Sequence, residues 1–250
     1  MESNLLKEGE RLDELQRDGR RIIQHPGVFC FGMDAVLLAA FAKAGPGEKV
    51  LDLCTGTGIV PILMESRCPG AHYTGLEIQE ASADMAARSV RCNGREEAIT
   101  ILQGDLRECT EMLPVGRWDA VTVNPPYMKA PSGRHNDNQR LSIARHEVEC
   151  TLDDVIRTAS RLLKSKGRFY MVHRPLRLVE ILERMHYYKL EPKRMQLVYP
   201  KIDREPNMVL IEGVRDGGAE LRVQPPLIIY NEDGTYTEPV RSIYEGKLEK

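Results

Sequence analysis

The chain has 250 residues, a formal net charge of −2, 42% hydrophobic residues and 29% charged residues. This length allows one α/β domain with a sizeable core, and no apolar run approaches the roughly 20 residues of a membrane span. The amino terminus lacks a signal-peptide pattern, and the six cysteines form no CxxC pair. These features argue against a disulfide framework and a metal site, so we expect a cytoplasmic protein with no membrane contact.

The first well-defined strand is predicted over residues 49–53. Ahead of it, residues 5–16 favour a strand or a short amphipathic helix, and residues 33–42 favour a helix. The strand leads into a Gly-rich turn over residues 54–58, after which a helix begins at Ile59. The turn has neither the G-x-G-x-x-G pattern nor the Gly-Lys-Ser/Thr of a P-loop. Asp52 at the strand end instead suits a ligand with an ammonium group.

Acidic residues also end the next two predicted strands, over residues 71–77 and 98–105. Glu77 at the end of the second strand suits the two hydroxyls of a ribose. Asp105 at the end of the third strand can accept a hydrogen bond from an adenine amino group. Each acid alone is more often the N-cap of a helix than a ligand. Three of them in order, at strand ends, favour a nucleotide-like cofactor.

The most informative motif is Asn124-Pro125-Pro126-Tyr127, which directly follows the apolar run 120–123. Two prolines stiffen the turn, and the first of them pushes Asn124 to an extended conformation at the strand end. The Asn124 amide oxygen and the Pro125 carbonyl can then accept both hydrogens of one exocyclic amine, and Tyr127 can stack on the ring. The alternative is a proline-rich turn after a buried strand.

The remaining chain continues the alternation of helices and strands. A helix is predicted over residues 151–163, with Thr151 as N-cap and Asp153 and Asp154 in its first turn. Further predicted elements are a strand at 168–173, a helix at 176–185, a closing antiparallel pair at 190–198 and 208–214, a short strand at 226–230, a turn at 233–234 and a charged tail.

Charge is distributed unevenly along the chain. Residues 129–204 hold 17 Lys and Arg against 9 Asp and Glu, a balance of +8, whereas the remainder holds 18 against 28, a balance of −10. A basic segment after the motif at residues 124–127 suits a phosphate-bearing partner, and Lys129, Arg134 and Arg140 lie in its polar, irregular part. The alternative is that helix surfaces simply carry these cations.

Over about residues 28–214 the chain resembles the class I S-adenosylmethionine-dependent methyltransferases of the amino-methylating branch. The resemblance implies a Rossmann-like α/β fold with a seven-stranded, mostly parallel sheet and an antiparallel closing strand. It implies that the Gly-rich turn holds the methionyl part of the cofactor, Glu77 the ribose and Asp105 the adenine. It makes Asn124, Pro125, Pro126 and Tyr127 the catalytic motif. The cofactor-binding set that it implies is Phe31, Gly32, Asp52, Thr55, Gly56, Thr57, Gly58, Glu77, Ile78, Asp105, Leu106 and Asn124.

A closer resemblance is to the bacterial tRNA1(Val) adenine-37-N6-methyltransferases, and it rests on residues 31–38, 143–147, 167–175 and 206–212. It implies methylation of an adenine N6 in tRNA, with Tyr127, Lys129, Arg134 and Arg140 contacting the RNA. The extension after residue 215 departs from the shorter members of that group.

We therefore expect a single domain over residues 1–250, as a monomer or homodimer. Residues 1–48 would cover substrate and cofactor, 49–214 would form the core, and 215–250 an extension. Three alternatives remain: a protein-glutamine methyltransferase of release factors, a guanine-N2 methyltransferase of rRNA, and a module that binds the cofactor without turnover. A large N-terminal helical domain would favour the first, and a Phe in place of Tyr127 the second.

Overall fold

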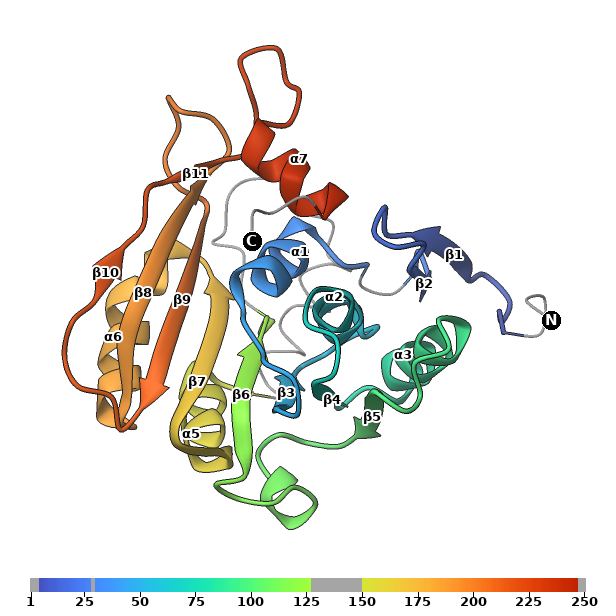
Figure 1. The fold of residues 1–250 in the computed structure, drawn as a ribbon, viewed down its shortest axis with the longest axis horizontal. Helices are drawn as coiled ribbons and strands as arrows, with labels where there is room; N and C mark the ends of the chain where they lie inside the picture. Colours follow the sequence, from blue (N-terminus) through green and yellow to red (C-terminus); the bar gives the residue numbers. More distant parts are fainter. Residues whose placement is uncertain (1–4, 28–29, 127–149, 247–250) are drawn as a thin grey trace.

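The structure is a computed structural model that describes residues 5–27, 30–126 and 150–246. Within these ranges the chain forms a central nine-stranded sheet with the order β10-β8-β9-β7-β6-β3-β4-β5, and β11 also pairs with β8 (Figure 1). Its strands are β3 (Lys49–Leu53), β4 (His72–Glu77), β5 (Ile99–Gln103), β6 (Trp118–Val123), β7 (Leu163–His173), β8 (Leu190–Tyr199), β9 (Met208–Arg215), β10 (Arg222–Val223) and β11 (Leu227–Ile228).

The seven long strands form the mostly parallel sheet that the sequence predicts. Strands β5, β4, β3, β6 and β7 pair in parallel, and β9 runs antiparallel to both β7 and β8. The short strands β10 and β11 lie parallel to β8 and extend its outer side. The carboxyl ends of β3, β4, β5, β6, β7 and β8 consequently meet at one edge of the sheet.

Helices cover both faces of this sheet because its strands are apolar on both sides. Successive side chains point to opposite faces, so Val50 and Tyr170 join one buried cluster whereas Leu51 and Met171 join the other. The first cluster lies under α1 (Met33–Phe41), α2 (Ile59–Arg67), α3 (Glu80–Cys92) and α7 (Glu238–Glu245), and the second under α5 (Leu152–Leu162) and α6 (Leu178–Tyr187). Short 3-10 turns occur at Cys109–Glu111 and Pro175–Arg177.

A two-stranded hairpin of β1 (Arg11–Glu14) and β2 (Arg21–Gln24) packs against α3. The backbone N–H of Ile23 donates to Ser89 Oγ at 2.9 Å, and Arg88 forms a fork to both carboxylate oxygens of Glu10 at 2.6 Å. For residues 5–16 the sequence predicted either a strand or a short amphipathic helix. The structure has a strand there, β1, over four residues. The proposed division of the chain at residues 48 and 214 stays a prediction.

The prediction of a charged tail after residue 234 was wrong, because this segment contains α7. Val240 and Ile243 are buried against the core, and Gly246 ends the helix with a φ of 76°. Arg67 Nη2 donates to the Ile243 carbonyl at 2.7 Å, which fastens α7 to α2. The charged residues occupy the outer face of a helix that is too short for its apolar pattern to stand out in the sequence. Among the helices in the described ranges, none is long and apolar enough to cross a membrane.

Candidate active site

The site lies where the winding of the sheet reverses, between β3 and β6. From β3 the chain builds β4 and β5 on one side, and β6 and β7 lie on the other. Open α/β sheets bind ligands outside the carboxyl ends of their strands at such a switch point. Asp52 on β3 and Thr122 on β6 are register partners there, and the Thr122 hydroxyl donates to Asp52 Oδ1 at 2.6 Å.

The Gly-rich turn after β3 has a tightly curved backbone. Cys54, Gly56 and Gly58 have φ angles of 58°, 57° and 85°. Gly58 begins α2, and a Cβ there would lie 3.2 Å from Ala86 Cβ, whereas a Cβ on Gly56 would meet nothing within 4 Å. Glycine at residue 58 therefore allows α2 to pack closely on α3. Glycine at residue 56 leaves the backbone open, so that a ligand can approach it closely.

Three buried polar atoms at the carboxyl ends of the neighbouring strands β3 and β6 have no hydrogen-bond partner among the described residues: Asp52 Oδ2, Thr55 Oγ1 and Asn124 Oδ1. Burial raises the pKa of Asp52 to about 7, although the hydrogen bond from the Thr122 hydroxyl opposes the rise. Buried polar groups are nearly always satisfied in folded proteins. A carboxylate, a hydroxyl and an amide oxygen with unused capacity fit the cationic, amino-acid-like end of a ligand.

Glu77 ends β4 and fixes the position of the turn. Its Oε2 accepts from the Gly56 N–H and its Oε1 from the Gln79 N–H, both at 2.9 Å, and the side chain is buried. An ionised carboxylate offers about four acceptor positions, so these bonds are compatible with the predicted contact to ribose hydroxyls. Ile78, half-buried directly after Glu77, lies beside that position.

Asp105 follows β5 and carries an ion pair with Arg107. Arg107 Nε donates to the carboxylate oxygens of Asp105 at 2.8 and 3.0 Å, and this pairing lowers the pKa of Asp105. Asp105 is thus ionised and an acceptor, as its predicted contact with an adenine amino group requires. The buried Leu106 accepts through its carbonyl from the Thr158 hydroxyl at 3.2 Å, which joins this loop to α5.

The Asn124-Pro125-Pro126-Tyr127 motif begins directly after β6, at the strand end where the sequence predicts it. Asn124 is half-buried, Pro125 is buried and Pro126 is half-buried, and none of the three lies in a helix or strand. The remaining predicted substrate contacts, Tyr127, Lys129, Arg134 and Arg140, lie outside the described residues.

Two of the residues that are predicted to bind the cofactor precede the central sheet in the sequence. Phe31 and Gly32 lie at the start of α1, where the Phe31 N–H donates to Gln24 Oε1 at 3.1 Å and Gly32 is the N-cap. Helix α1 packs on α2, which begins at the Gly-rich turn. Thr57 is buried within that turn. The cofactor-binding role of these three residues stays a prediction.

A cleft of about 140 Å³ opens beside the motif. Its walls are formed by Pro125, Pro126, Cys150, Thr151, Leu152, Val155, His173 and Arg177. His173 and Arg177 were not among the sequence-predicted site residues. His173 ends β7, the strand next to β6, so its place at a strand end was the signal that could have identified it.

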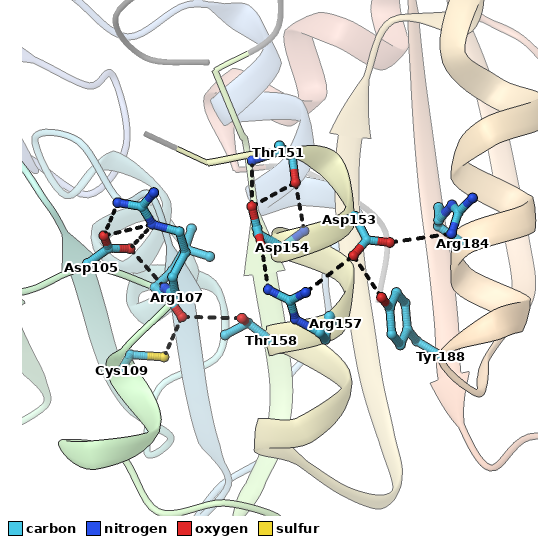
Figure 2. A network of polar contacts seen from close by, with 11 residues as sticks. Asp105, Arg107, Cys109, Thr151, Asp153, Asp154, Arg157, Thr158, Arg184 and Tyr188 are labelled. Atoms are coloured by element: carbon cyan, nitrogen blue, oxygen red, sulfur yellow. Dashed lines mark hydrogen bonds and ion pairs between the residues drawn. The ribbon is translucent and has the colours of Figure 1, made fainter. Parts of the chain in front are cut away.

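Helix α5 holds one wall of the cleft through a polar network (Figure 2). Thr151 and Asp154 form a reciprocal capping box, with Asp154 N–H to Thr151 Oγ1 at 3.1 Å and Thr151 N–H to Asp154 Oδ2 at 3.0 Å. Arg157 pairs with Asp154 and Asp153, and the Tyr188 hydroxyl donates to Asp153 at 2.7 Å. The network links α5 to the end of α6 and confirms the predicted N-cap.

Within the described ranges, no group of three or more His, Cys, Asp or Glu side chains is placed to hold a metal ion. The parallel sheet, the Gly-rich turn at its switch point and the strand-end acids define a Rossmann-like class I methyltransferase fold. Comparison with known proteins identifies the family more closely.

The methyltransferase small domain family matches residues 19–189, so the chain belongs to that family. The tRNA1(Val) (adenine(37)-N6)-methyltransferase of Porphyromonas gingivalis is 30% identical over 187 residues, 72% of each chain. The enzyme of the same name from Aeromonas hydrophila is 26% identical over 208 residues, 83% of this chain and 85% of its own.

Solved structures share the fold. A crystal structure described as a predicted O-methyltransferase from Agrobacterium tumefaciens aligns with a TM-score of 0.72 at 23% identity, covering 87% of this chain and 98% of its own. A geranyl diphosphate methyltransferase in complex with SAM aligns with a TM-score of 0.55 at 18% identity, covering 73% of this chain and 84% of its own. The expected fold class is thereby confirmed.

Proposed function

We propose that the protein transfers a methyl group from S-adenosylmethionine to the exocyclic N6 of an adenine in tRNA. The names of the relatives from P. gingivalis and A. hydrophila support the substrate, and the motif at the end of β6 supports the reaction. A tRNA substrate would place the protein in the cytoplasm.

The single observation that carries the proposal is the Asn124 side chain. Its Oδ1 is buried and has no hydrogen-bond partner among the described residues, at a strand end followed by two prolines. An adenine amine is a weak nucleophile because its lone pair is delocalised into the ring. Asn124 Oδ1 and the Pro125 carbonyl would each accept one N–H, which favours the pyramidal nitrogen needed for attack.

The proposed cofactor fits the residues around the Gly-rich turn. Asp52 and Thr55 would hold the amino-acid end, Glu77 the ribose and Asp105 the adenine. When bound, S-adenosylmethionine supplies a methyl group already activated for displacement. The protein's own contribution would then be mainly alignment, which can supply roughly 7–11 kcal/mol of the barrier. No strong general base is required, because the alkylated nitrogen loses its proton readily.

Mass spectrometry tests the proposal directly. Bulk tRNA and rRNA from a deletion strain are incubated with the purified protein and labelled cofactor, then digested to nucleosides. We expect labelled N6-methyladenosine from tRNA alone. Label on guanine N2 of rRNA would instead support an rRNA methyltransferase. A parallel incubation with a release factor in place of RNA tests for label on glutamine, and cofactor binding without a labelled product in either incubation would support a non-catalytic module.

A further inference from the structure

Two cysteines that are far apart in the sequence, Cys54 and Cys150, lie together at the carboxyl edge of the sheet. Cys54 directly follows β3, whose last residue, Leu53, is the register partner of Val123 at the end of β6. Cys150 precedes α5 and lines the cleft beside Pro125, two residues after Val123. Both side chains pack against the same buried cluster. Two thiols therefore meet between the Gly-rich turn and α5, and the proposed reaction gives neither of them a role.

The two thiols are in direct contact. Both are free and half-buried, and a side-chain hydrogen bond joins them. This bond raises the pKa of Cys54 and lowers the pKa of Cys150, so the Cys54 thiol donates and the Cys150 sulfur accepts. The charge of Arg107 also lowers the pKa of Cys150, whereas burial and the carboxylates of Asp154 and Asp105 oppose the fall. Because the thiolate is the reactive form of cysteine, Cys150 is the nucleophile of the pair.

Cys150 is also the member of the pair that a small oxidant can reach. It forms part of the wall of the cleft, whose volume of about 140 Å³ far exceeds the roughly 15 Å³ that one water molecule needs. Cys54 is not one of the residues that line the cleft. An accessible cysteine with a lowered pKa beside a second, resolving cysteine is the arrangement typical of redox-sensitive sites.

We propose that Cys54 and Cys150 form a reversible disulfide that inactivates the enzyme when hydrogen peroxide enters the cleft. In the first step the Cys150 thiolate attacks one peroxide oxygen. The O–O bond breaks, Cys150 becomes a sulfenic acid, and the departing hydroxide takes up the proton that Cys150 released. In the second step the Cys54 sulfur attacks the Cys150 sulfur, the S–O bond breaks, and the hydroxyl leaves as water with the Cys54 proton. The two thiols thus lose two electrons, and one peroxide becomes two waters.

The bridge would change the geometry of the candidate site. A disulfide holds its sulfur atoms roughly 2.0 Å apart, closer than hydrogen-bond contact. It would therefore draw the start of α5 toward the Gly-rich turn and narrow the cleft beside Pro125. A misplacement of about 1 Å at a reacting centre can lower the rate by about 10²-fold. This loss of methylation rests on the proposed function, whereas the bridge itself does not.

Mass spectrometry of the full-length protein tests the bridge. Reduced protein is treated with hydrogen peroxide, the remaining thiols are blocked with N-ethylmaleimide, and peptides are mapped with and without dithiothreitol. We expect a cross-link between Cys54 and Cys150 to form before the other four cysteines are oxidised. Recovery of both as maleimide adducts, or pairing of either with a different cysteine, would overturn the inference. This measurement needs no variant and no RNA.

Single substitutions separate the two steps. In Cys54→Ser the hydroxyl can still donate to Cys150, but no disulfide can form, so Cys150 should remain a sulfenic acid that dimedone labels. In Cys150→Ser the attacking thiolate is absent, so Cys54 should remain a thiol. Cys92→Ser, at the end of α3, is the matched control and should form the bridge as wild type does. Dimedone label on Cys54 in Cys150→Ser, with none on Cys150 in Cys54→Ser, would contradict the assigned order of attack.

Methylation of bulk tRNA from a deletion strain is measured on the same samples, each relative to its own reduced form. We expect peroxide to lower kcat/KM by about 10- to 100-fold in wild type and in Cys92→Ser. Dithiothreitol should restore it, because this reagent reverses disulfides by exchange. Cys150→Ser should keep the activity of its reduced form. A mapped bridge with unchanged kcat/KM would rule out inactivation, whereas absence of methylation by reduced wild type would overturn the proposed function and leave the mapped bridge standing.

Discussion

Thr122 and Asp52 join β6 to β3 at the switch point of the sheet through a 2.6 Å hydrogen bond from the Thr122 hydroxyl to Asp52 Oδ1. This bond uses one carboxylate oxygen and leaves Oδ2 buried beside the Gly-rich turn. The same burial raises the pKa of Asp52 to about 7. Asp52 is thus held in a place where its charge is unfavourable until a cation arrives.

We predict that Asp52→Asn stabilises the cofactor-free protein at pH 8. In the unfolded chain Asp52 ionises near pH 4, whereas in the folded protein it keeps its proton up to about pH 7. The folded state therefore binds more protons in this window, and wild-type stability falls as pH rises from 4 to 7. Each pKa unit corresponds to about 1.4 kcal/mol. Denaturant unfolding at several pH values measures the difference between variant and wild type.

Asp233→Asn is the control for this prediction. Hydrogen bonds from Thr235 lower the pKa of Asp233, so the ionised Asp233 carboxylate favours the folded state. Asp233→Asn should therefore change the pH dependence of stability in the opposite direction to Asp52→Asn. A stability difference between Asp52→Asn and wild type that does not change between pH 4 and 8 would contradict the assigned pKa. Thr122→Val should raise the pKa of Asp52 further, because the Thr122 hydroxyl lowers it.

Gly56→Ala should abolish cofactor binding while the fold survives. An added Cβ meets no atom within 4 Å, so it projects into the space that the ligand would use. Gly47→Ala is the matched control, since Gly47 also has a positive φ, 76°, and nothing within 4 Å, but lies away from the turn. Both variants should lose about 1–2 kcal/mol of stability from backbone strain. Calorimetry with S-adenosylmethionine should distinguish them, and equal affinities would exclude close approach at residue 56.

Much of the fold was predictable because the parallel strands contain short apolar runs, and acids stand at or near the ends of β3, β4 and β5. The amino half of β7 was missed, since Lys164, Ser165 and Lys166 are exposed and carry no apolar pattern. The bond between Asp52 and Thr122 could not be predicted either. It depends on which strands are neighbours, and these two residues are 70 positions apart.

The candidate site was predictable in part, because the ends of the parallel strands can be located in the sequence. Strand-end acids and the motif after β6 are visible in the sequence, whereas the place of His173 in the cleft follows from the adjacency of β6 and β7. Helix α7 was missed because a charged surface hides the two buried positions, Val240 and Ile243, that fix it to the core.

Glu77→Gln should weaken cofactor binding almost as much as Glu77→Ala. Both oxygens of Glu77 accept backbone N–H groups, from Gly56 and Gln79. An amide places its NH₂ against one of these N–H donors, so one of the two hydrogen bonds that position the turn is lost. The ribose also loses an anionic acceptor. Calorimetry compares both variants with Glu80→Gln, an exposed residue at the start of α3. Wild-type affinity in Glu77→Gln would remove Glu77 from the ribose role.

Replacing Lys129, Arg134 and Arg140 together by Ala should weaken tRNA binding and flatten its dependence on salt. If each contacts one phosphate, the slope of log K against log salt should fall by about 2–3. Lys164 and Lys166 provide the control, because they lie at the amino end of β7, away from the cleft. Filter binding at several salt concentrations measures the slopes. Identical slopes for wild type and the triple variant would show that this basic segment is only solvated surface.

Asn124→Ala should leave cofactor binding largely intact and lower single-turnover methylation by about 10²- to 10³-fold, the usual effect of removing one group aligned on a reacting centre. The reason is geometric. Asn124 Oδ1 is buried at the end of β6 with no partner among the described residues, and stiff prolines follow it. Without it, only the Pro125 carbonyl remains to orient the amine. Asn231→Ala serves as control, because among the described residues that side chain bonds to Thr235 and Tyr236, close to it in the sequence. Rapid-quench assays with saturating cofactor isolate the transfer step. Near-normal transfer in Asn124→Ala would exclude this mechanism even if the product is N6-methyladenosine.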